Sequence, residues 1–224
     1  MTGRTRATIV TRGMQTDAQL LEAWRAGDAG AGTQLFRRNF PSVFRFFQTK
    51  VPDAVEELVQ RTFLACVEAG DRLDQVVSFR AYLLGIARNQ LLRYFSEKHR
   101  TRRIEQGVAA VAEASSFDRT GPIDLMVKND EQRLLLKGLR RLPLDLQIAL
   151  ELFYWERLAM HEIARIIDVP EGTVKSRLHR AKRLLKDLIE GLDASDALRE
   201  STVHRLESWA RLLREHIDER AEDA

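Results

Sequence analysis

The stretch from Asp168 to Arg180, DVPEGTVKSRLHR, carries side chains suited to chemistry with a nucleic acid. A break with Pro and Gly is followed by a run with helical spacing. At 100° per residue, apolar side chains cluster around Val174. The polar side chains fall on the other side and the flanks of this helix: Thr173, Lys175, Ser176, Arg177 and Arg180. Arg can pair with guanine through two hydrogen bonds, Ser and Thr can meet phosphates or base edges, and Lys supplies positive charge.

The segment just before this helix, MHEIARIID, has the spacing of a scaffold helix. Ile163 and Ile167 lie four residues apart, and the small Ala164 permits a close helix crossing. A short break between two such helices predicts a helix-turn-helix, whose second helix enters the major groove. Asp168 stands where many such turns have Gly, although Asp tolerates the left-handed conformation. Ala159 lacks the capping side chain of Ser or Thr, a loss of about 1 kcal/mol. The alternative is an ordinary solvated helix with a basic face.

The composition is that of an ordinary globular protein. The chain has 224 residues, 44% apolar and 31% charged, with a net charge of +3, which suggests one or two domains with small cores. Cys66 is the single cysteine, so an intramolecular disulfide and a cysteine-cluster zinc site are excluded, in keeping with a reducing cytosol. No apolar run approaches the ~20 residues of a membrane span, and the first residues lack the apolar stretch of a signal peptide. We therefore expect a cytoplasmic protein.

Helical periodicity runs through most of the chain, without strand-like alternation. The pattern weakens from Thr101 to about Lys128, where small and polar residues and Gly121-Pro122 predict a linker. We predict an all-α fold of two small helical domains joined by a flexible linker and followed by a C-terminal helical extension. The expected boundaries are 1–16 for a mobile tail, 17–100 for the first domain, 101–129 for the linker, 130–191 for the second domain and 192–224 for the extension.

A segment of the first domain, EELVQRTF, has two different sides when it is placed on a helix. One side is apolar or small: Val55, Leu58, Val59, Thr62 and Cys66. We expect this side to be core, so Cys66 is a packing residue rather than a reactive thiol. The other side carries Glu56, Glu57 and Gln60, either as a solvated acidic face or as a surface for a basic partner. Asp17 and Asp53 are expected helix N-caps.

The words EELVQRTF, FRAYLLGIARNQLLRYF and MHEIARIIDVPEGTVKSRLHRAKRLLKDL together resemble bacterial sigma factors of the extracytoplasmic-function (ECF) group of the sigma-70 family. The resemblance covers about Asp17 to Leu192, in the family's order and with the linker in its place. It implies sigma regions 2 and 4, and a protein that binds core RNA polymerase, directs it to −35 and −10 promoter elements and assists −10 melting. Many relatives are held by an anti-sigma protein, which is a further candidate partner.

The resemblance also implies roles for individual residues. It assigns the −35 element to Thr173, Lys175, Ser176, Arg177 and Arg180. In the −10 region, rings stack on exposed bases and Arg holds the backbone; the candidates are Phe79, Arg80, Tyr82, Arg88 and Asn89. The clamp of the largest catalytic subunit of the polymerase would bind Glu56, Glu57 and Gln60. A core role for Tyr82 and a structural hydrogen bond for Asn89 are the alternatives.

The −10 region departs from the family's pattern. The family usually has Trp where Tyr82 stands, Asp where Arg93 stands and an Arg pair where Ser96 and Glu97 stand. A basic cluster, KHRTRR, follows at residues 98–103 and would supply phosphate contacts. The family's −10 sequence preference is therefore not carried over to this chain.

The C-terminal extension goes beyond the family's pattern. Residues 192–224 contain nine acidic residues and five arginines, a net charge of 5 − 9 = −4. One helical face would be apolar: Val203, Leu206, Trp209, Leu213 and Ile217. This face either packs on the second domain and completes its core, or covers the basic DNA-binding face or another protein.

We expect no enzymatic activity, cofactor or metal, because five scattered His, one Cys and no Gly-rich phosphate loop do not form a site. Two other functions stay open at this point. A stand-alone helix-turn-helix regulator would bind promoters tightly as an isolated chain and would give EELVQ no role. A degenerate sigma would bind proteins without reading DNA.

Overall fold

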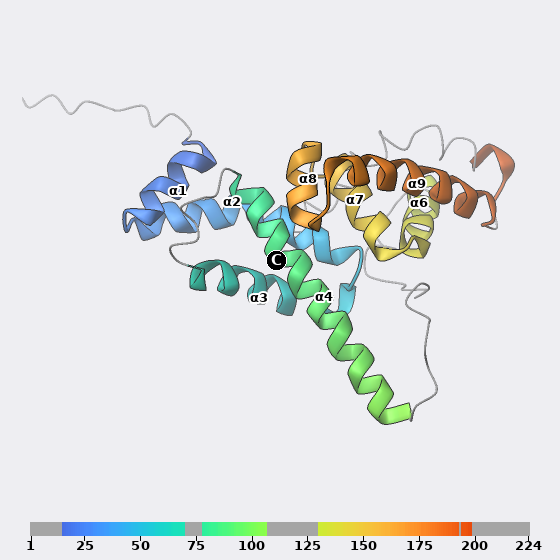
Figure 1. The fold of residues 1–224 in the computed structure, drawn as a ribbon, viewed down its shortest axis with the longest axis horizontal. Coiled ribbons are helices and arrows are strands. Elements are labelled where there is room, and N and C mark those ends of the chain that lie inside the picture. The colour runs from blue at the N-terminus through green and yellow to red at the C-terminus, as the bar shows by residue number, and fades with distance from the viewer. Residues whose placement is uncertain (1–14, 70–77, 107–129, 193, 199–224) are drawn as a thin grey trace, which may run out of the picture.

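The computed structural model describes residues 15–69, 78–106, 130–192 and 194–198, with side chains through Arg100 in the second range. These residues form α-helices and one short 3-10 helix, and no strand occurs among them. The helices before and after residues 107–129 form two bundles that lie against each other (Figure 1). The predicted all-α fold with two helical domains is therefore confirmed.

The first bundle is built around aromatic side chains. Its elements are α1 (Asp17–Arg25), α2 (Ala29–Gln48), a 3-10 helix (Pro52–Ala54), α3 (Val55–Glu68) and α4 (Phe79–Gln106). The ring of Phe36 on α2 lies 5.0 Å from that of Trp24, 5.2 Å from that of Phe63 and 6.0 Å from that of Phe79, so one ring ties four helices together. Gly32 allows the close approach of α1, because a Cβ there would lie 2.6 Å from Cδ1 of Trp24.

The second bundle has an aliphatic core. Its elements are α6 (Asp130–Arg141), α7 (Leu144–Tyr154), α8 (Met160–Ile167) and α9 (Glu171–Glu190). The buried positions of α9 recur every three or four residues and face the other helices. Helix α6 crosses α9 closely at Gly138, where a Cβ would lie 2.9 Å from Cδ1 of Leu185. Trp155, at the end of α7, is buried in this core.

Two helix starts differ from the sequence prediction. Thr16, not Asp17, is the N-cap of α1; its hydroxyl accepts a hydrogen bond from Gln19 N, and Asp17 lies in the first turn. Asp53 lies in the 3-10 helix, and α3 begins two residues later without a capping side chain. Both N-cap predictions were wrong because the capping residue depends on where the backbone turns into the helix. Helical spacing locates that point only to within a few residues. Asp28 caps α2 through Ala31 N.

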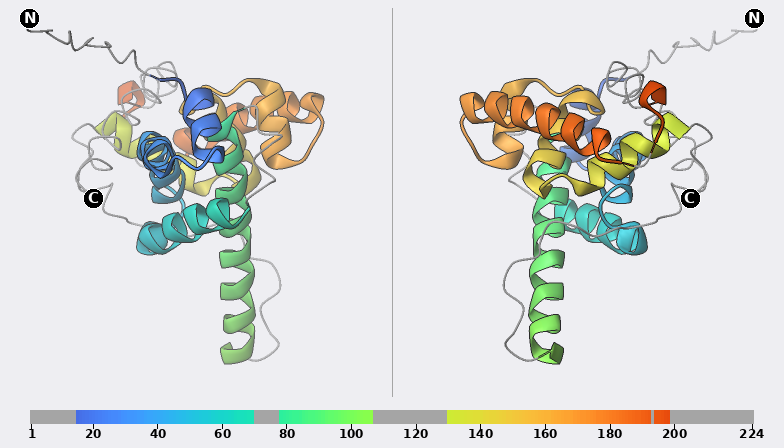
Figure 2. Two further views of the ribbon diagram at one scale, coloured as in Figure 1. Left: turned by 90° about the vertical axis from the view of Figure 1, so that its left-hand side faces the viewer. Right: turned by 90° about the vertical axis from the view of Figure 1, so that its right-hand side faces the viewer.

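Helix α4 is longer than expected and continues past residue 100 to Gln106, into the range expected to be linker. Its C-terminal half extends away from both bundles (Figure 2). Its N-terminal half lies between the two bundles, with α2 and α3 on one side and α8 on the other. The helix therefore contacts both domains with different faces. The apolar face predicted in the C-terminal extension lies outside the described residues.

Candidate nucleic-acid and polymerase interfaces

Helices α8 and α9 form the predicted helix-turn-helix. Asp168 ends α8 in the left-handed conformation (φ 54°, ψ 58°), as predicted for the residue at this turn. The turn is closed by Val169 N donating to Ala164 O over 3.1 Å, and Pro170 starts α9. Ala159 gives α8 no capping side chain, but Glu162 Oε2 accepts from Ala159 N at 2.9 Å. That hydrogen bond satisfies one backbone amide without replacing a cap on the first turn.

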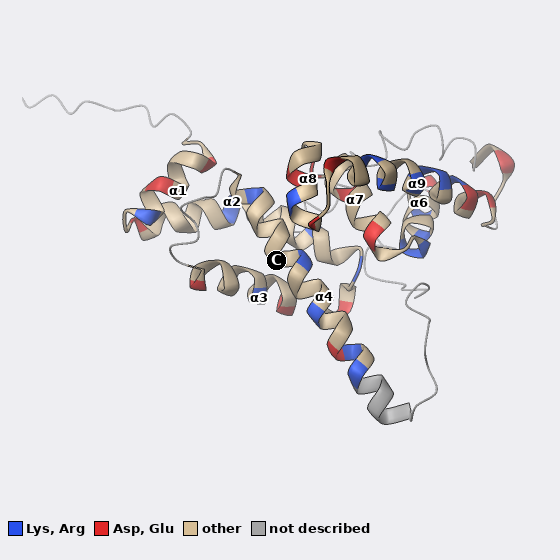
Figure 3. Cartoon of the chain, in the orientation of Figure 1, with Lys and Arg blue, Asp and Glu red and all other residues tan. Residues whose placement is uncertain are grey.

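The buried and polar sides of α9 agree with the helical spacing. Val174, Leu178, Ala181 and Leu185 are buried. Of the five candidate residues for −35 recognition, Lys175, Ser176 and Arg180 are exposed, and Thr173 and Arg177 are half-buried. The structure therefore brings all five together on one helix, outside the core. Figure 3 shows the basic residues following one another along α9.

Arg177 is restrained by the helix on which the motif packs. Its Nε lies 3.6 Å from Oδ2 of Asp145 at the start of α7, and its side chain is 26% exposed. Ser176 donates its hydroxyl to Thr173 O over 2.9 Å, a bond within the helix that leaves the side chain at the surface. A pair as exposed as Arg177 and Asp145 contributes little to stability, so the Arg177 guanidinium can leave Asp145 and bind another acceptor at a small cost in free energy.

The five candidates for the −10 element on α4 occupy different environments. Phe79 is 3% exposed and belongs to the aromatic core. Arg80, Tyr82 and Arg88 are half-buried, and Asn89 is exposed. In this arrangement the Phe79 ring lies where no base can stack on it, and its packing with Phe36 and Trp24 accounts for an aromatic residue at this position. The other four reach the surface of α4.

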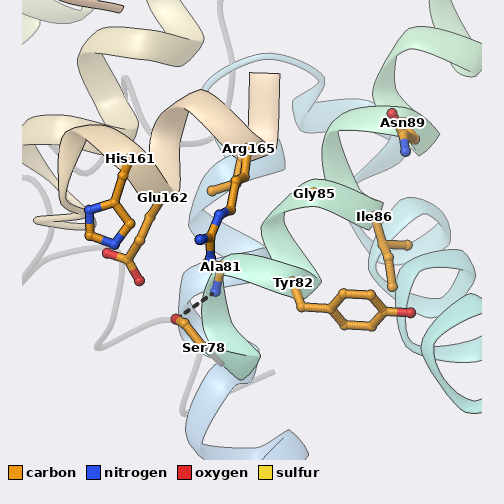
Figure 4. Close-up of a pocket in the computed structure, with 10 residues that line it drawn as sticks. Ser78, Ala81, Tyr82, Gly85, Ile86, Asn89, His161, Glu162 and Arg165 are labelled. Carbon is orange, nitrogen blue, oxygen red and sulfur yellow. Dashed lines mark hydrogen bonds between the residues drawn. The ribbon is translucent and has the colours of Figure 1, made fainter. Parts of the chain in front are cut away.

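A cavity of about 340 Å³ lies between α4 and α8 (Figure 4). It is lined from the α4 side by Ser78, Ala81, Tyr82, Gly85, Ile86 and Asn89, and from α8 by His161, Glu162, Arg165 and Ile166. In Figure 4 the Arg165 side chain extends toward the start of α4, while the Tyr82 ring extends away from α8. Ser78 Oγ accepts a hydrogen bond from Ala81 N at 3.3 Å and caps α4. Two −10 candidates, Tyr82 and Asn89, thus belong to the lining of this cavity, although the Tyr82 ring extends away from α8.

Arg88 joins the two candidate DNA surfaces electrostatically. Burial lowers the pKa of its guanidinium, the positive charge of Arg177 lowers this pKa further, and Asp168 opposes the shift. Arg88 belongs to α4, whereas Arg177 and Asp168 belong to the helix-turn-helix. Side chains predicted to contact two different DNA elements therefore lie close enough for their charges to interact.

Helix α3 presents the predicted two-sided arrangement. Val55, Leu58, Val59, Thr62 and Cys66 are buried, as expected. Glu56, Glu57 and Gln60 are exposed. Burial raises the pKa of the Cys66 thiol to about 12, which fits a packing residue. Arg61 lies 2.5 Å from Glu57 and 3.7 Å from Glu97 of α4, so part of the acidic face is already paired within the protein.

The outer face of α3 also contains apolar residues that the sequence analysis missed. Leu64 is 58% exposed and Val67 is 51% exposed. Spacings of three, four and three residues place Glu57, Gln60, Leu64 and Val67 on one side of the helix. The signal was present in the sequence, since these apolar residues fall off the buried side. Their exposure turns a polar face into a mixed one, which is typical of a protein-binding surface rather than a solvated helix.

The basic cluster at residues 98–103 begins on the projecting part of α4, where Lys98, His99 and Arg100 are exposed. The side chains of residues 101–103 lie outside the described residues. Arg93, Ser96 and Glu97, which differ from the family's pattern, are exposed on the same helix. Within the described part of the chain, no group of His, Cys, Asp and Glu is arranged to hold a metal ion. No described helix has the combined length and apolar content needed to cross a bilayer.

Comparison with known proteins accounts for both bundles. Residues 35–101 match sigma-70 region 2, and residues 132–185 match sigma-70 region 4. The ECF RNA polymerase sigma-E factors of Salmonella typhimurium and Escherichia coli K12 are each 30% identical over 185 residues, covering 79% of this chain and 96% of the relative. The sigma-E factor of Haemophilus influenzae is 28% identical over 183 residues.

Two solved structures share the fold. The sigma factor RpoE from Bartonella quintana, in complex with the anti-sigma factor NepR, aligns with a TM-score of 0.56 at 23% identity, over 72% of this chain and 98% of that one. CnrH in complex with the cytosolic domain of CnrY aligns with a TM-score of 0.55 at 22% identity, over 80% and 99%. The sequence motifs, the helix-turn-helix and the sequence relatives agree: the chain belongs to the ECF group of the sigma-70 family of RNA polymerase sigma factors.

Proposed function

We propose that this protein binds core RNA polymerase and directs it to promoters, with α9 reading the −35 element and α4 contributing to recognition and melting of the −10 element. The observation that carries this proposal is the combination, in one chain of this family, of a basic exposed helix-turn-helix face and a mixed polar and apolar outer face on α3. A stand-alone DNA-binding regulator needs only the first of these surfaces.

The −35 element would meet the N-terminal half of α9. Lys175 and Arg180 are exposed and require no rearrangement to reach DNA. Arg177 would exchange its contact with Asp145 for a base edge or phosphate. The N-terminal end of the helix adds a partial positive charge, which favours phosphate.

The −10 element would meet the exposed part of α4. Arg80, Arg88 and Asn89 supply donors to the DNA backbone or to base edges, and Tyr82 supplies a ring for stacking. Capturing an unstacked base offsets the few kcal/mol that unpairing costs. Phe79 would act indirectly, by holding the start of α4 against α2.

Core polymerase would be bound by the outer face of α3. Glu56, Glu57 and Gln60 supply acceptors for a basic surface, and Leu64 and Val67 supply apolar area beside them. A contact of this kind combines electrostatic steering with burial of apolar surface. An anti-sigma protein is a further candidate partner, since one similar solved structure is of a sigma factor bound to the anti-sigma factor NepR.

Run-off transcription with purified core polymerase on a pool of genomic promoter fragments tests the proposal. We expect discrete new start sites that depend on this protein. Leu64→Asp should abolish most of this transcription and weaken co-elution with core polymerase, because it places a charge in the apolar part of the contact. Ala18→Asp, at an exposed position on α1, is the matched control and should leave both unchanged. Promoter binding by the chain alone, with neither start sites nor co-elution, would favour a stand-alone regulator instead.

A further inference from the structure

Two ion pairs among the described residues join the two domains and are buried from solvent. Arg45 on α2 contacts Glu156, just after α7, with Nε 2.8 Å and Nη2 2.6 Å from the same carboxylate oxygen. Lys50, just after α2, contacts Glu151 on α7. All four side chains are at most 4% exposed. We call these two pairs the interdomain latch.

The latch is integrated into both domains. Glu151 also accepts hydrogen bonds from Gln147 Nε2 at 2.9 Å and from Thr49 Oγ1 at 3.2 Å. Lys50 donates to Phe46 O at 2.8 Å and lies 4.1 Å from the centre of the Phe46 ring. Burial lowers the pKa of Lys50 and raises that of Glu151, and each partner opposes the other's shift. Removing one partner of either pair would therefore leave the other as an unpaired buried charge, which strongly destabilises the closed interface.

A latch made of buried charges suits a contact that has to open. The attraction within a buried ion pair is offset by the cost of removing both charges from water. On opening, all four side chains regain their hydration, so the net free energy of the contact is modest although its geometry is specific. An apolar contact of the same size would lack this compensation.

The closed arrangement cannot place both candidate DNA surfaces on one promoter. The numbers −35 and −10 are positions relative to the transcription start, so the two elements are separated by about 25 base pairs. This corresponds to about 85 Å at about 3.4 Å per pair. Here Arg88 on α4 and Arg177 on α9 are close enough for their charges to repel each other. Helix α4 also packs against α8, and Tyr82 and Asn89 belong to the lining of the cavity between these two helices. Reading both elements at once requires the domains to separate.

The chain has the length to allow this separation. Residues 107–129 between the bundles number 23 and could span at most about 80 Å if fully extended. We infer that the closed arrangement is an autoinhibited state held by the interdomain latch, and that opening the latch is a step that precedes engagement of the two promoter elements. This inference rests on the proposed function, because it assumes that α4 and α9 bind DNA.

Charge reversal on the first domain gives the sharpest test. Arg45→Glu and Lys50→Glu each place two carboxylates in contact and should open the latch. Each variant also lowers the net charge by two, which by itself weakens binding to DNA. If the latch is autoinhibitory, both variants should nevertheless bind a promoter duplex at least tenfold tighter than the wild type at one salt concentration, measured by fluorescence anisotropy on the full chain.

Two further variants control for charge and restore the contact. Arg37→Glu makes the same charge change at an exposed position of α2 and should bind DNA equally well or more weakly. The double variant Arg45→Glu with Glu156→Arg recreates an ion pair of opposite direction and should return affinity toward that of the wild type. Dyes on cysteines introduced at the exposed positions Glu22 and Lys137 report opening as a loss of energy transfer.

Separation of the domains without tighter binding to the promoter duplex would overturn the inference. So would an Arg45→Glu protein that has native helicity and shows no change in energy transfer. If Arg45→Glu fails to fold, Glu156→Gln replaces it, because it removes one charge with almost no change in size; the same two outcomes apply. Run-off transcription by the wild type is measured in parallel. Normal transcription together with opening that gives no gain in affinity would reject the latch while preserving the proposed function.

Discussion

Helices α9 and α4 both carry residues predicted to read promoter DNA, yet helical spacing predicted the exposure of these residues well for α9 and poorly for α4. α9 packs on its own domain through one side, so all five of its candidate residues lie outside the core. α4 packs on α2 and α3 and also on α8. Its candidates are accordingly divided between the core, the interdomain cavity and the surface. Helical periodicity identifies a binding face when one side of a helix is buried, and it fails when two sides are buried by different partners.

The largest expected effect tests the assignment of Phe79, a −10 candidate on α4, to the core. Phe79→Ala should lower the free energy of unfolding by about 3–5 kcal/mol, because a large ring leaves a cavity among Trp24 and Phe36. Urea denaturation measures the change, and Phe79→Leu is the control that keeps most of the volume. A fully stable Phe79→Ala protein that has lost promoter melting would instead show that the ring acts on DNA.

Cys66 tests whether the inner side of α3, which supports α4, is as closed as the structure indicates. The thiol pKa is raised from 9.0 to about 12, so at pH 8 the fraction of thiolate should fall by a factor on the order of a thousand relative to the unfolded chain. We expect a thiol reagent to label the native protein correspondingly slowly and the urea-unfolded protein rapidly. Rapid labelling of the native chain would mean that this core opens readily.

The same shift has a consequence for stability. The folded pKa lies above the unfolded one, so the folded state holds this proton more tightly. The contribution of Cys66 is complete below about pH 9 and is lost as the pH rises toward 12. Cys66→Ala, compared with the wild type over this range, should show a smaller loss of stability with rising pH.

The reading face of α9 is tested with Arg177. We expect Arg177→Ala to weaken binding to a −35 duplex by about 1–3 kcal/mol and to relax the base preference at one position. The lost contact with Asp145 adds little, because the pair is partly exposed. Arg183→Ala, further along the exposed side, should weaken binding equally for all sequences. An unchanged base preference in Arg177→Ala would assign this arginine to phosphate.

The smallest expected effect is a gain. Ala159→Ser should stabilise the protein by about 1 kcal/mol, because the hydroxyl can accept from the first turn of α8. Thermal unfolding measures it, and Ala159→Val, which adds no acceptor and is as poor an N-cap residue as Ala, is the control. No gain from serine would indicate that the Glu162 hydrogen bond already meets the need for a cap.

Much of the architecture could be predicted from the sequence because it depends on local patterns. The buried sides of α3 and α9 follow from spacing, and the left-handed conformation of Asp168 follows from its place where such turns usually have Gly. The interdomain latch could not be predicted. Its four residues, Arg45, Lys50, Glu151 and Glu156, are of charged types that usually lie at the surface. Only the packing of the two domains removes them from water, and the paired residues lie over a hundred positions apart in the sequence.

The exposed residues of α3 were missed for a different reason. Leu64 and Val67 were visible in the sequence as apolar residues off the buried side. Their meaning depends on whether another element covers them, and helical spacing carries no information on this. The same limit applied to Phe79, whose aromatic character fits a core and a base-stacking role equally well until its neighbours are known.

The contact between Gly32 and Trp24 has a consequence for the evolution of this chain. Any side chain at position 32 would push a Cβ to 2.6 Å from the indole. The indole in turn lies against Phe36 and Phe79, at the start of the helix that carries the −10 candidates. Substitution at this one position is therefore restricted by packing inside the core, and a lineage that replaced Gly32 would first have to accept a smaller residue at position 24.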